Sequence, residues 1–233
     1  MIFNPCLKTI FSFVTLLFRK LYEYGTYIIF PPYCAQCKKF LTQRAVFCDA
    51  CFAHVDPIVS FPLCITQKWT IPVFAVSVYR NPIKRLILAK GWSNRVASYQ
   101  LGQLIWERTA LRNRQFDYIV PIPLHWRRFA WRGYNQSEEI ACYLSRKSGK
   151  KIVSVLKRVK HTKFQSRCSG KNRHANVADV FQVYVKDRAQ FVGKHLVLVD
   201  DLMTTGATLK AATRELIKLK LASVTAVVAC RVV

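Results

Sequence analysis

The segment HLVLVDDLMTTGATL, residues 195–209, decides the fold of this chain of 233 residues. Residues 196–199 form a continuous apolar run, which is typical of a strand buried on both faces. Asp200 and Asp201 follow directly, and a small-residue loop then opens a helical pattern; the loop consists of Thr204, Thr205, Gly206, Ala207 and Thr208. Backbone N–H groups, hydroxyl groups and a helix dipole therefore meet beside two carboxylates. The combination predicts a sugar-phosphate site, and the alternative is an Asp-rich turn before a capped helix.

Predicted strands and helices alternate along the rest of the chain. Strands are predicted over 73–79, 116–120, 152–156, 181–185, 196–199 and 224–229, and helices over 83–90, 96–112, 137–148 and 208–219. Asn135, three residues before Glu138, has the spacing of a helix N-cap. Strands interleaved with helices indicate an α/β fold with a mostly parallel sheet and helices on both faces. Ligands of such sheets bind at the carboxyl ends of the strands, where Asp200 and Asp201 are expected.

Nine cysteines make an odd total, which argues against a complete disulfide framework and favours a reducing cytosol. Four of them form two C-x2-C pairs that are ten residues apart, namely Cys34, Cys37, Cys48 and Cys51. Each pair can turn two sulfurs toward one centre, and four thiolates leave no open coordination position. The spacing therefore predicts a structural zinc site of the ribbon type. Redox dithiols or unliganded core cysteines are the alternatives.

Three parts are expected along the chain. Residues 1–30 have the periodicity of an amphipathic helix, residues 31–66 form a small zinc-ribbon-like module, and residues 67–233 form the α/β domain. The apolar stretch 7–18 is shorter than the roughly 20 residues that a membrane-spanning helix needs, and no small-residue cleavage site follows it. We expect this helix to dock on its own protein. Attachment to a membrane surface, or a signal or anchor, is the alternative.

The charge balance is strongly basic, because 37 Lys+Arg stand against 12 Asp+Glu and give a net charge of +25. Such a chain favours a polyanionic partner. Basic residues interleaved with aromatic residues are concentrated over 121–175, a pattern typical of single-strand nucleic-acid binding. The candidate phosphate contacts are Arg127, Arg128, Arg132, Lys157, Arg158 and Lys163, and the stacking candidates are Trp126 and Trp131. A solvated basic surface without a ligand is the alternative.

Three motifs resemble known families. Residues 197–209 resemble the phosphoribosyl pyrophosphate motif of type I phosphoribosyltransferases. Residues 121–141, PIPLHWRRFAWRGYNQSEEIA, resemble a signature of the ComF competence protein family, which has relatives in the GntX group. A third block comprises Arg158, Thr162, Gln165, Arg173, Asn176 and Phe181. The resemblance covers roughly residues 31–233. Two departures are visible: Cys168 stands where a Leu is expected, and a second cysteine cluster is reduced to Cys64.

The resemblance implies a ligand, cofactors and partners. Asp200 and Asp201 would be the catalytic acids and would hold the ribose hydroxyls of phosphoribosyl pyrophosphate. The loop 204–208 would hold the 5'-phosphate, and magnesium would bridge pyrophosphate and ribose oxygens. The partners would be single-stranded DNA and competence proteins such as the ComFA helicase or a DNA-processing protein. The location would be cytoplasmic, with peripheral contact at the inner face of the membrane.

The activity stays open at this stage. We expect a competence protein that handles incoming single-stranded DNA during natural transformation. One alternative is an active phosphoribosyltransferase that moves ribosyl phosphate to a nitrogen acceptor. The other is a scaffold or regulatory protein whose nucleotide-like site senses a metabolite.

Overall fold

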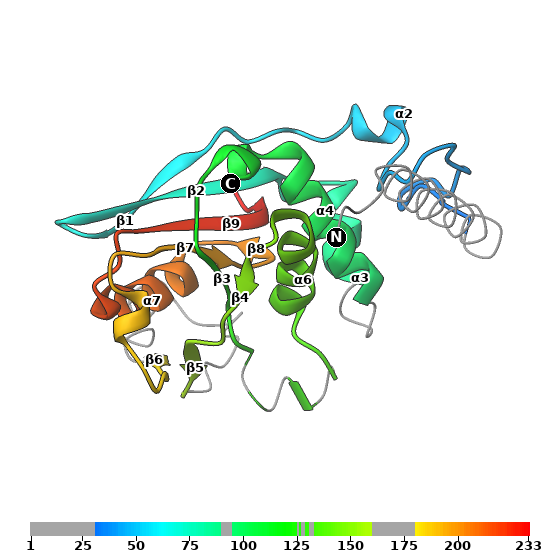
Figure 1. Ribbon diagram of the computed structural model, residues 1–233. Coiled ribbons are helices and arrows are strands. Elements are labelled where there is room, and N and C mark those ends of the chain that lie inside the picture. Colours follow the sequence, from blue (N-terminus) through cyan, green and yellow to red (C-terminus); the bar gives the residue numbers. More distant parts are fainter. Residues whose placement is uncertain (1–30, 90–94, 125, 127–128, 131–132, 160–179) are drawn as a thin grey trace, which may run out of the picture. The chain divides into compact units, whose positions relative to one another are not determined.

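The computed structural model of the chain describes residues 31–89, 95–124, 126, 129–130, 133–159 and 180–233 (Figure 1). These residues belong to two compact units, Met1–Phe52 and Ala53–Val233. The helix expected over residues 1–30 lies outside the described residues. Within the described ranges, every helix is too short or too polar to cross a membrane.

A seven-stranded sheet forms the centre of the second unit, with the strand order β1-β2-β9-β7-β3-β4 and β8 beside β9. Among these described strands only β1 and β2 pair antiparallel, and all other pairs are parallel. The predicted mostly parallel sheet is therefore confirmed. The bounds of the strands are β1 Phe61–Thr66, β2 Trp69–Val78, β3 Tyr118–Pro121, β4 Lys151–Ile152, β7 His195–Val199, β8 Leu202–Met203 and β9 Ser223–Arg231.

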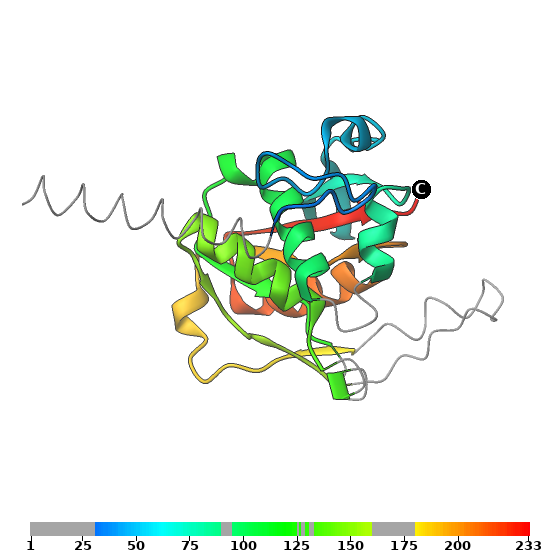
Figure 2. The same cartoon turned by 90° about the vertical axis from the view of Figure 1, so that its right-hand side faces the viewer.

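Helices cover both faces of this sheet, as expected. Successive residues of a strand point to opposite faces, and in β7 Leu198 belongs to the same buried cluster as Leu209 and Leu216 of α7. The neighbouring Val199 is also fully buried but lies outside that cluster. The α4 and α6 helices lie side by side and contact the strands (Figure 2). The helices are α2 Asp49–Phe52, α3 Ile83–Ala89, α4 Arg95–Arg108, α6 Gln136–Ser148 and α7 Ala207–Leu216, with 3-10 turns at Ala110–Asn113, Ala189–Phe191 and Ile217–Leu219.

A glycine sets the close approach of α4 to α6. A Cβ atom at Gly102 would lie 2.8 Å from the Cβ of Tyr143 and 3.0 Å from the carbonyl oxygen of Ile140. These distances are shorter than ordinary van der Waals contacts, so any larger residue at position 102 would separate the two helices.

The predicted N-cap of α6 is confirmed. The side-chain oxygen of Asn135 accepts a hydrogen bond from the N–H of Ser137 at 3.2 Å, and its Nδ2 donates to the carbonyl of Ile122 at 3.0 Å. A buried side chain with both ends bonded fixes where the helix begins. Asn135 thus connects the start of α6 to the residue that follows β3.

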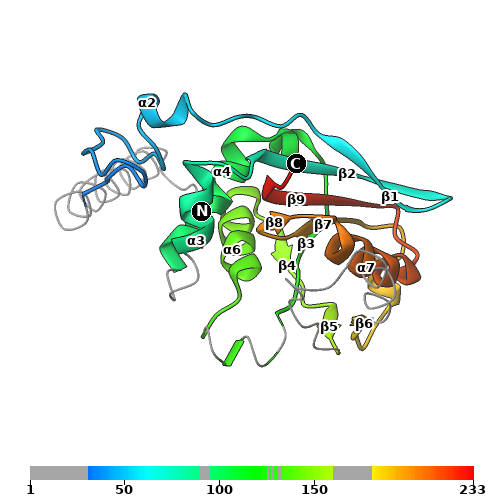
Figure 3. The ribbon, with the colours of Figure 1, turned by 180° about the vertical axis from the view of Figure 1, so that it is seen from behind.

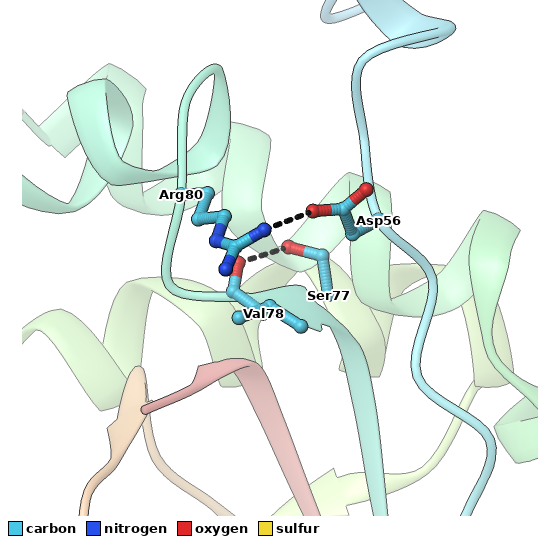
Figure 4. A network of polar contacts seen from close by, with 4 residues as sticks. All are labelled: Asp56, Ser77, Val78 and Arg80. Carbon is cyan, nitrogen blue, oxygen red and sulfur yellow. Dashed lines mark hydrogen bonds and ion pairs between the residues drawn. The ribbon is translucent and has the colours of Figure 1, made fainter. Parts of the chain in front are cut away.

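The first unit ends earlier than expected. We expected the cysteine module to reach residue 66, whereas the structure divides the chain after Phe52. Residues beyond this point run along β2: Pro57 bridges to Ser77, and Asp56 pairs with Arg80 at 3.5 Å (Figure 4). The following strand β1 then forms a hairpin with β2. Residues 53–66 therefore belong to the α/β unit.

Two further strands form a separate sheet that does not pair with the main one. It pairs β5, Leu156–Arg158, antiparallel with β6, Phe181–Val183. Both strands contact α7 (Figure 3). A single strand was predicted over 152–156, but the structure ends β4 at Ile152 and starts β5 at Leu156, in a different sheet.

Candidate functional site

The two predicted acids lie at the carboxyl end of β7. The N–H of Asp200 still donates to Val227 of β9 at 3.0 Å, so Asp200 continues the strand ladder. The carbonyl of Asp201 accepts from Ala229 at 3.1 Å, and β8 then pairs with the end of β9. The backbone on both sides of the acids is therefore tied to the sheet. Both residues are half-buried.

The small-residue loop leads directly into α7, as predicted. Gly206 occupies the N-cap position with φ +75°, a conformation that L side chains rarely adopt. A Cβ there would also lie 2.8 Å from Cε of Met203 and 3.1 Å from Cδ1 of Leu63. Thr204 and Thr205 are exposed, and Thr208 is half-buried. The structure thus brings Asp200, Asp201 and the loop 204–208 together at one edge of the sheet.

The first turn of α7 is available to an anion. Glycine has no side chain that could accept from the first N–H groups of the helix, and Gly206 provides no cap hydrogen bond. The N–H of Ala207 donates a hydrogen bond to Thr205 Oγ1 at 3.4 Å. The first N–H groups of a helix have no partner within the helix, so they and the positive end of the helix dipole favour a phosphate at this position.

Ser137 is a site residue that the sequence interpretation missed. Its hydroxyl donates to Oδ1 of Asp200 at 3.2 Å, and the N–H of Asp201 donates to the same oxygen at 2.9 Å. Ser137 lies in the first turn of α6, so this bond brings a second helix N-terminus to the acids. The adjacent Gln136 is buried, and its Nε2 has no hydrogen-bond partner among the described residues. The motif YNQS contained the signal, because the predicted start of α6 falls within it.

Arg231 is a second residue near the site that was not predicted, and it is charged. It ends β9 opposite Met203 of β8, beside the loop. Its guanidinium carbon lies 4.2 Å from the ring centroid of Phe61, a cation–π contact. Its Nε is buried without a hydrogen-bond partner in the described part of the chain. A cation is therefore held near the carboxyl edge of the sheet.

The first unit contains a metal-binding arrangement of four sulfurs. The Sγ atoms of Cys34, Cys37, Cys48 and Cys51 all lie within 4.8 Å of one another. The Sγ atoms of Cys37 and Cys48 are 3.7 Å apart. A tetrahedron with metal–sulfur bonds of about 2.3 Å has edges of about 3.8 Å, so this distance fits one shared ion. The predicted grouping is confirmed.

The cysteines differ in how readily they ionise. Burial acts to raise the pKa of Cys34, but backbone N–H groups of Cys37, Cys48 and Gln36 donate to its sulfur and lower the pKa to about 6. Desolvation and hydrogen bonds among the thiols raise the pKa of Cys51 to about 12. Neighbouring thiolates repel one another, so full ionisation of the cluster requires a cation at its centre.

The predicted nucleic-acid residues are only partly within the described chain. Trp126 is exposed, and Lys157 is exposed on β5. Arg158 is half-buried, lies over the ring of Phe181 at 5.5 Å and has a buried Nε, which suits it poorly to phosphate contact. The remaining candidates lie outside the described residues: Arg127, Arg128, Trp131, Arg132 and Lys163.

Part of the chain matches a known domain family. Residues 142–232 match the phosphoribosyl transferase domain family. Among solved structures, the chain is similar to adenine phosphoribosyltransferase of Thermoanaerobacter pseudethanolicus, with a TM-score of 0.40, 13% identity and coverage of 78% of this chain and 98% of that one. It is also similar to glutamine phosphoribosylpyrophosphate amidotransferase of B. subtilis, with a TM-score of 0.40, 17% identity and coverage of 57% of this chain and 26% of that one.

Two sequence relatives cover most of the chain. DNA utilization protein YhgH of Salmonella typhimurium is 27% identical over 85% of this chain and 89% of its own length. Competence protein F of Haemophilus influenzae is 31% identical over 81% of this chain and 80% of its own length. At this identity and coverage, and with the domain match that includes the site, the chain belongs to the competence protein F family.

Proposed function

We propose that the chain handles incoming single-stranded DNA in the cytoplasm during natural transformation, and that it binds phosphoribosyl pyrophosphate between β7 and α7. The ligand site is inferred from the pair Asp200 and Asp201, fixed at the end of a buried strand beside the start of α7, where the N-cap residue Gly206 has no side chain. The net charge of +25 supports a polyanionic partner. The names of the relatives, competence protein F and DNA utilization protein, support DNA as that partner.

The residues of the site fit the parts of this ligand. The two carboxylates accept hydrogen bonds from ribose hydroxyls, and the hydroxyl of Ser137 holds Asp200 in position for this role. The N–H groups and threonines of 204–208 surround the 5'-phosphate. Magnesium, when bound, neutralises charge on the pyrophosphate. The carboxylates, the loop and the dipole of α7 together orient one phosphorylated sugar.

Transfer of the ribosyl phosphate is the second candidate function. The observation that favours it is that two neighbouring carboxylates, Asp200 and Asp201, stand half-buried at the strand end, beside the loop that leads into α7. Stabilisation of the departing pyrophosphate would be the main contribution of the protein. A screen for pyrophosphate release across nucleobases, with phosphoribosyl pyrophosphate and magnesium, separates a transferase from a protein that only binds the ligand.

The metal of the cysteine cluster is, in our proposal, zinc. Four thiolates in a tetrahedral arrangement suit zinc and close its coordination sphere, so the site stabilises the fold. The first unit gains from such an ion because a module of this size buries little apolar surface.

Purified without chelator, the chain should contain one zinc ion, measured by inductively coupled plasma mass spectrometry. Cys37→Ser should lose most of this zinc, whereas Cys64→Ser, which changes an exposed cysteine on β1, should keep it. Because protons compete with the metal for thiolates, zinc retention should fall as the pH is lowered. Zinc-free protein, or a disulfide between the two cysteine pairs, would contradict the assignment.

Asp201→Asn should weaken the binding of phosphoribosyl pyrophosphate with magnesium by about 10- to 100-fold, because the amide has no charge and puts an NH2 donor in place of one acceptor oxygen. Isothermal titration calorimetry measures this change. Asp56→Asn is the matched control, since it removes the same charge at the Arg80 ion pair. A variant at Gly206 is a weaker test, because an added side chain would strain the backbone and meet Met203 and Leu63. Equal affinity for parent and Asp201→Asn, or no affinity in the parent, would refute the ligand site.

Single-stranded DNA should bind with a strong salt dependence and weak sequence preference. The five candidate phosphate contacts other than Arg158 predict a slope of log affinity against log salt of about 3.5 in magnitude, at about 0.7 per contact. Changing Arg127, Arg128 and Arg132 together to Glu should lower affinity for all sequences and reduce the slope by about 2. Fluorescence anisotropy at several salt concentrations measures both, with Asp201→Asn as the variant that should leave DNA binding intact. An unchanged slope and affinity in the triple variant would show that this charge serves another purpose.

A further inference from the structure

The β5–β6 pair has two chemically different faces. Leu156 pairs with Val183, and both side chains are buried in the core cluster that includes α7. Lys157 pairs with Gln182, and both are exposed. Because side chains alternate along a strand, one face of this ribbon holds it to the domain and the other faces solvent.

Two further residues extend the solvent face. The N–H of Tyr184 donates to the carbonyl of Val155, and the N–H of Val159 donates to the carbonyl of Val180, both at 2.9 Å. The backbone pairing therefore continues past both ends of the strands. Tyr184 and Val159 lie two residues beyond Gln182 and Lys157, and so share their face. We call the set Lys157, Val159, Gln182 and Tyr184 the outer face.

An exposed aromatic ring is the main feature of the outer face. Tyr184 is 74% exposed, and Val159 is 45% exposed. The Nζ of Lys157 lies 5.7 Å from the centroid of the Tyr184 ring. A large ring left in water beside a cation, on a backbone fixed by strand pairing, is an arrangement that stacks a flat apolar group and holds a negative charge next to it.

The charge around the outer face favours an anionic partner. Apart from Arg158, which lies over Phe181, four cations stand against Asp187 within the described segments 151–159 and 180–188: Lys151, Lys157, Lys186 and Arg188. The sequence between the strands, 160–179, adds five more cations against Asp179. A partner that fits must combine dense negative charge with flat rings, which is the chemistry of a single-stranded nucleic acid.

We propose that Tyr184 stacks one base of a single strand, while Lys157 contacts the adjoining phosphate. This inference rests on the proposed DNA function and deepens it, because it places a base-binding position on β5–β6. A base within a duplex is already stacked on its neighbours, so the ring contributes only where the bases are free. The outer face thus selects single strands over duplexes.

The experiment compares two probes of equal length and charge, a 20-nucleotide oligothymidylate and an abasic 20-mer, by fluorescence anisotropy. Tyr184→Leu should weaken binding to oligothymidylate about tenfold, as expected for the loss of one stacked base, and leave the abasic probe unaffected. Tyr184→Phe, which keeps the ring, should bind both probes like the parent. Tyr184 is exposed, so these variants should fold, which circular dichroism confirms.

Lys157→Gln should weaken binding to both probes and lower the salt slope by about 0.7, because it removes one phosphate contact. The matched control is Lys68→Gln, which removes the same charge in the exposed turn between β1 and β2. It should change the affinity for neither probe. A parent that binds neither probe overturns the proposed DNA function, and this inference with it. If the parent binds, but Tyr184→Leu weakens binding to both probes equally or to neither of them, the DNA function stands and the stacking role of Tyr184 is refuted.

Discussion

The carboxylate of Asp200 is the point on which the site depends. Its backbone N–H is bonded to β9, and its Oδ1 accepts both the N–H of Asp201 and the hydroxyl of Ser137. A half-buried charge of this kind is stable only with hydrogen-bond donors around it. One oxygen therefore joins the end of β7, the turn after it and the first turn of α6. The positive ends of α6 and α7 are brought to the same edge of the sheet, where negative charge is favoured.

The helices on the two faces of the sheet support different parts of the site. On one face Gly102 allows α4 and α6 to pack closely, which makes α6 a firm support for Ser137. On the other face the core cluster joins α7 to β1 and continues under β5 and β6. The loop 204–208 begins α7, so the ligand site and the β5–β6 ribbon share one helix as their support. This arrangement gives a physical basis for two binding functions in one domain.

Local signals predicted the parts of the structure that local chemistry decides. The apolar run 196–199, the spacing of the four cysteines and the cap residue Asn135 each led to the observed element. Other parts depend on contacts distant in sequence. The edge strand β1 contains Pro62 and an exposed Cys64, which weakens its strand pattern, and it forms only because β2 pairs with it. Strand β8 has two residues and is defined by its pairing with β9. Likewise, the composition that marked Arg158 as a phosphate contact could not show that it faces inward over Phe181.

The most direct test of this account is a crystal structure of the chain grown with phosphoribosyl pyrophosphate and magnesium. The account predicts electron density for the 5'-phosphate at the start of α7, within hydrogen-bond distance of the N–H groups of residues 205–208, and for the ribose hydroxyls at Asp200 and Asp201. Density for the ligand at any other place would contradict it. So would a well-defined loop 204–208 with no ligand density beside it at saturating ligand concentration.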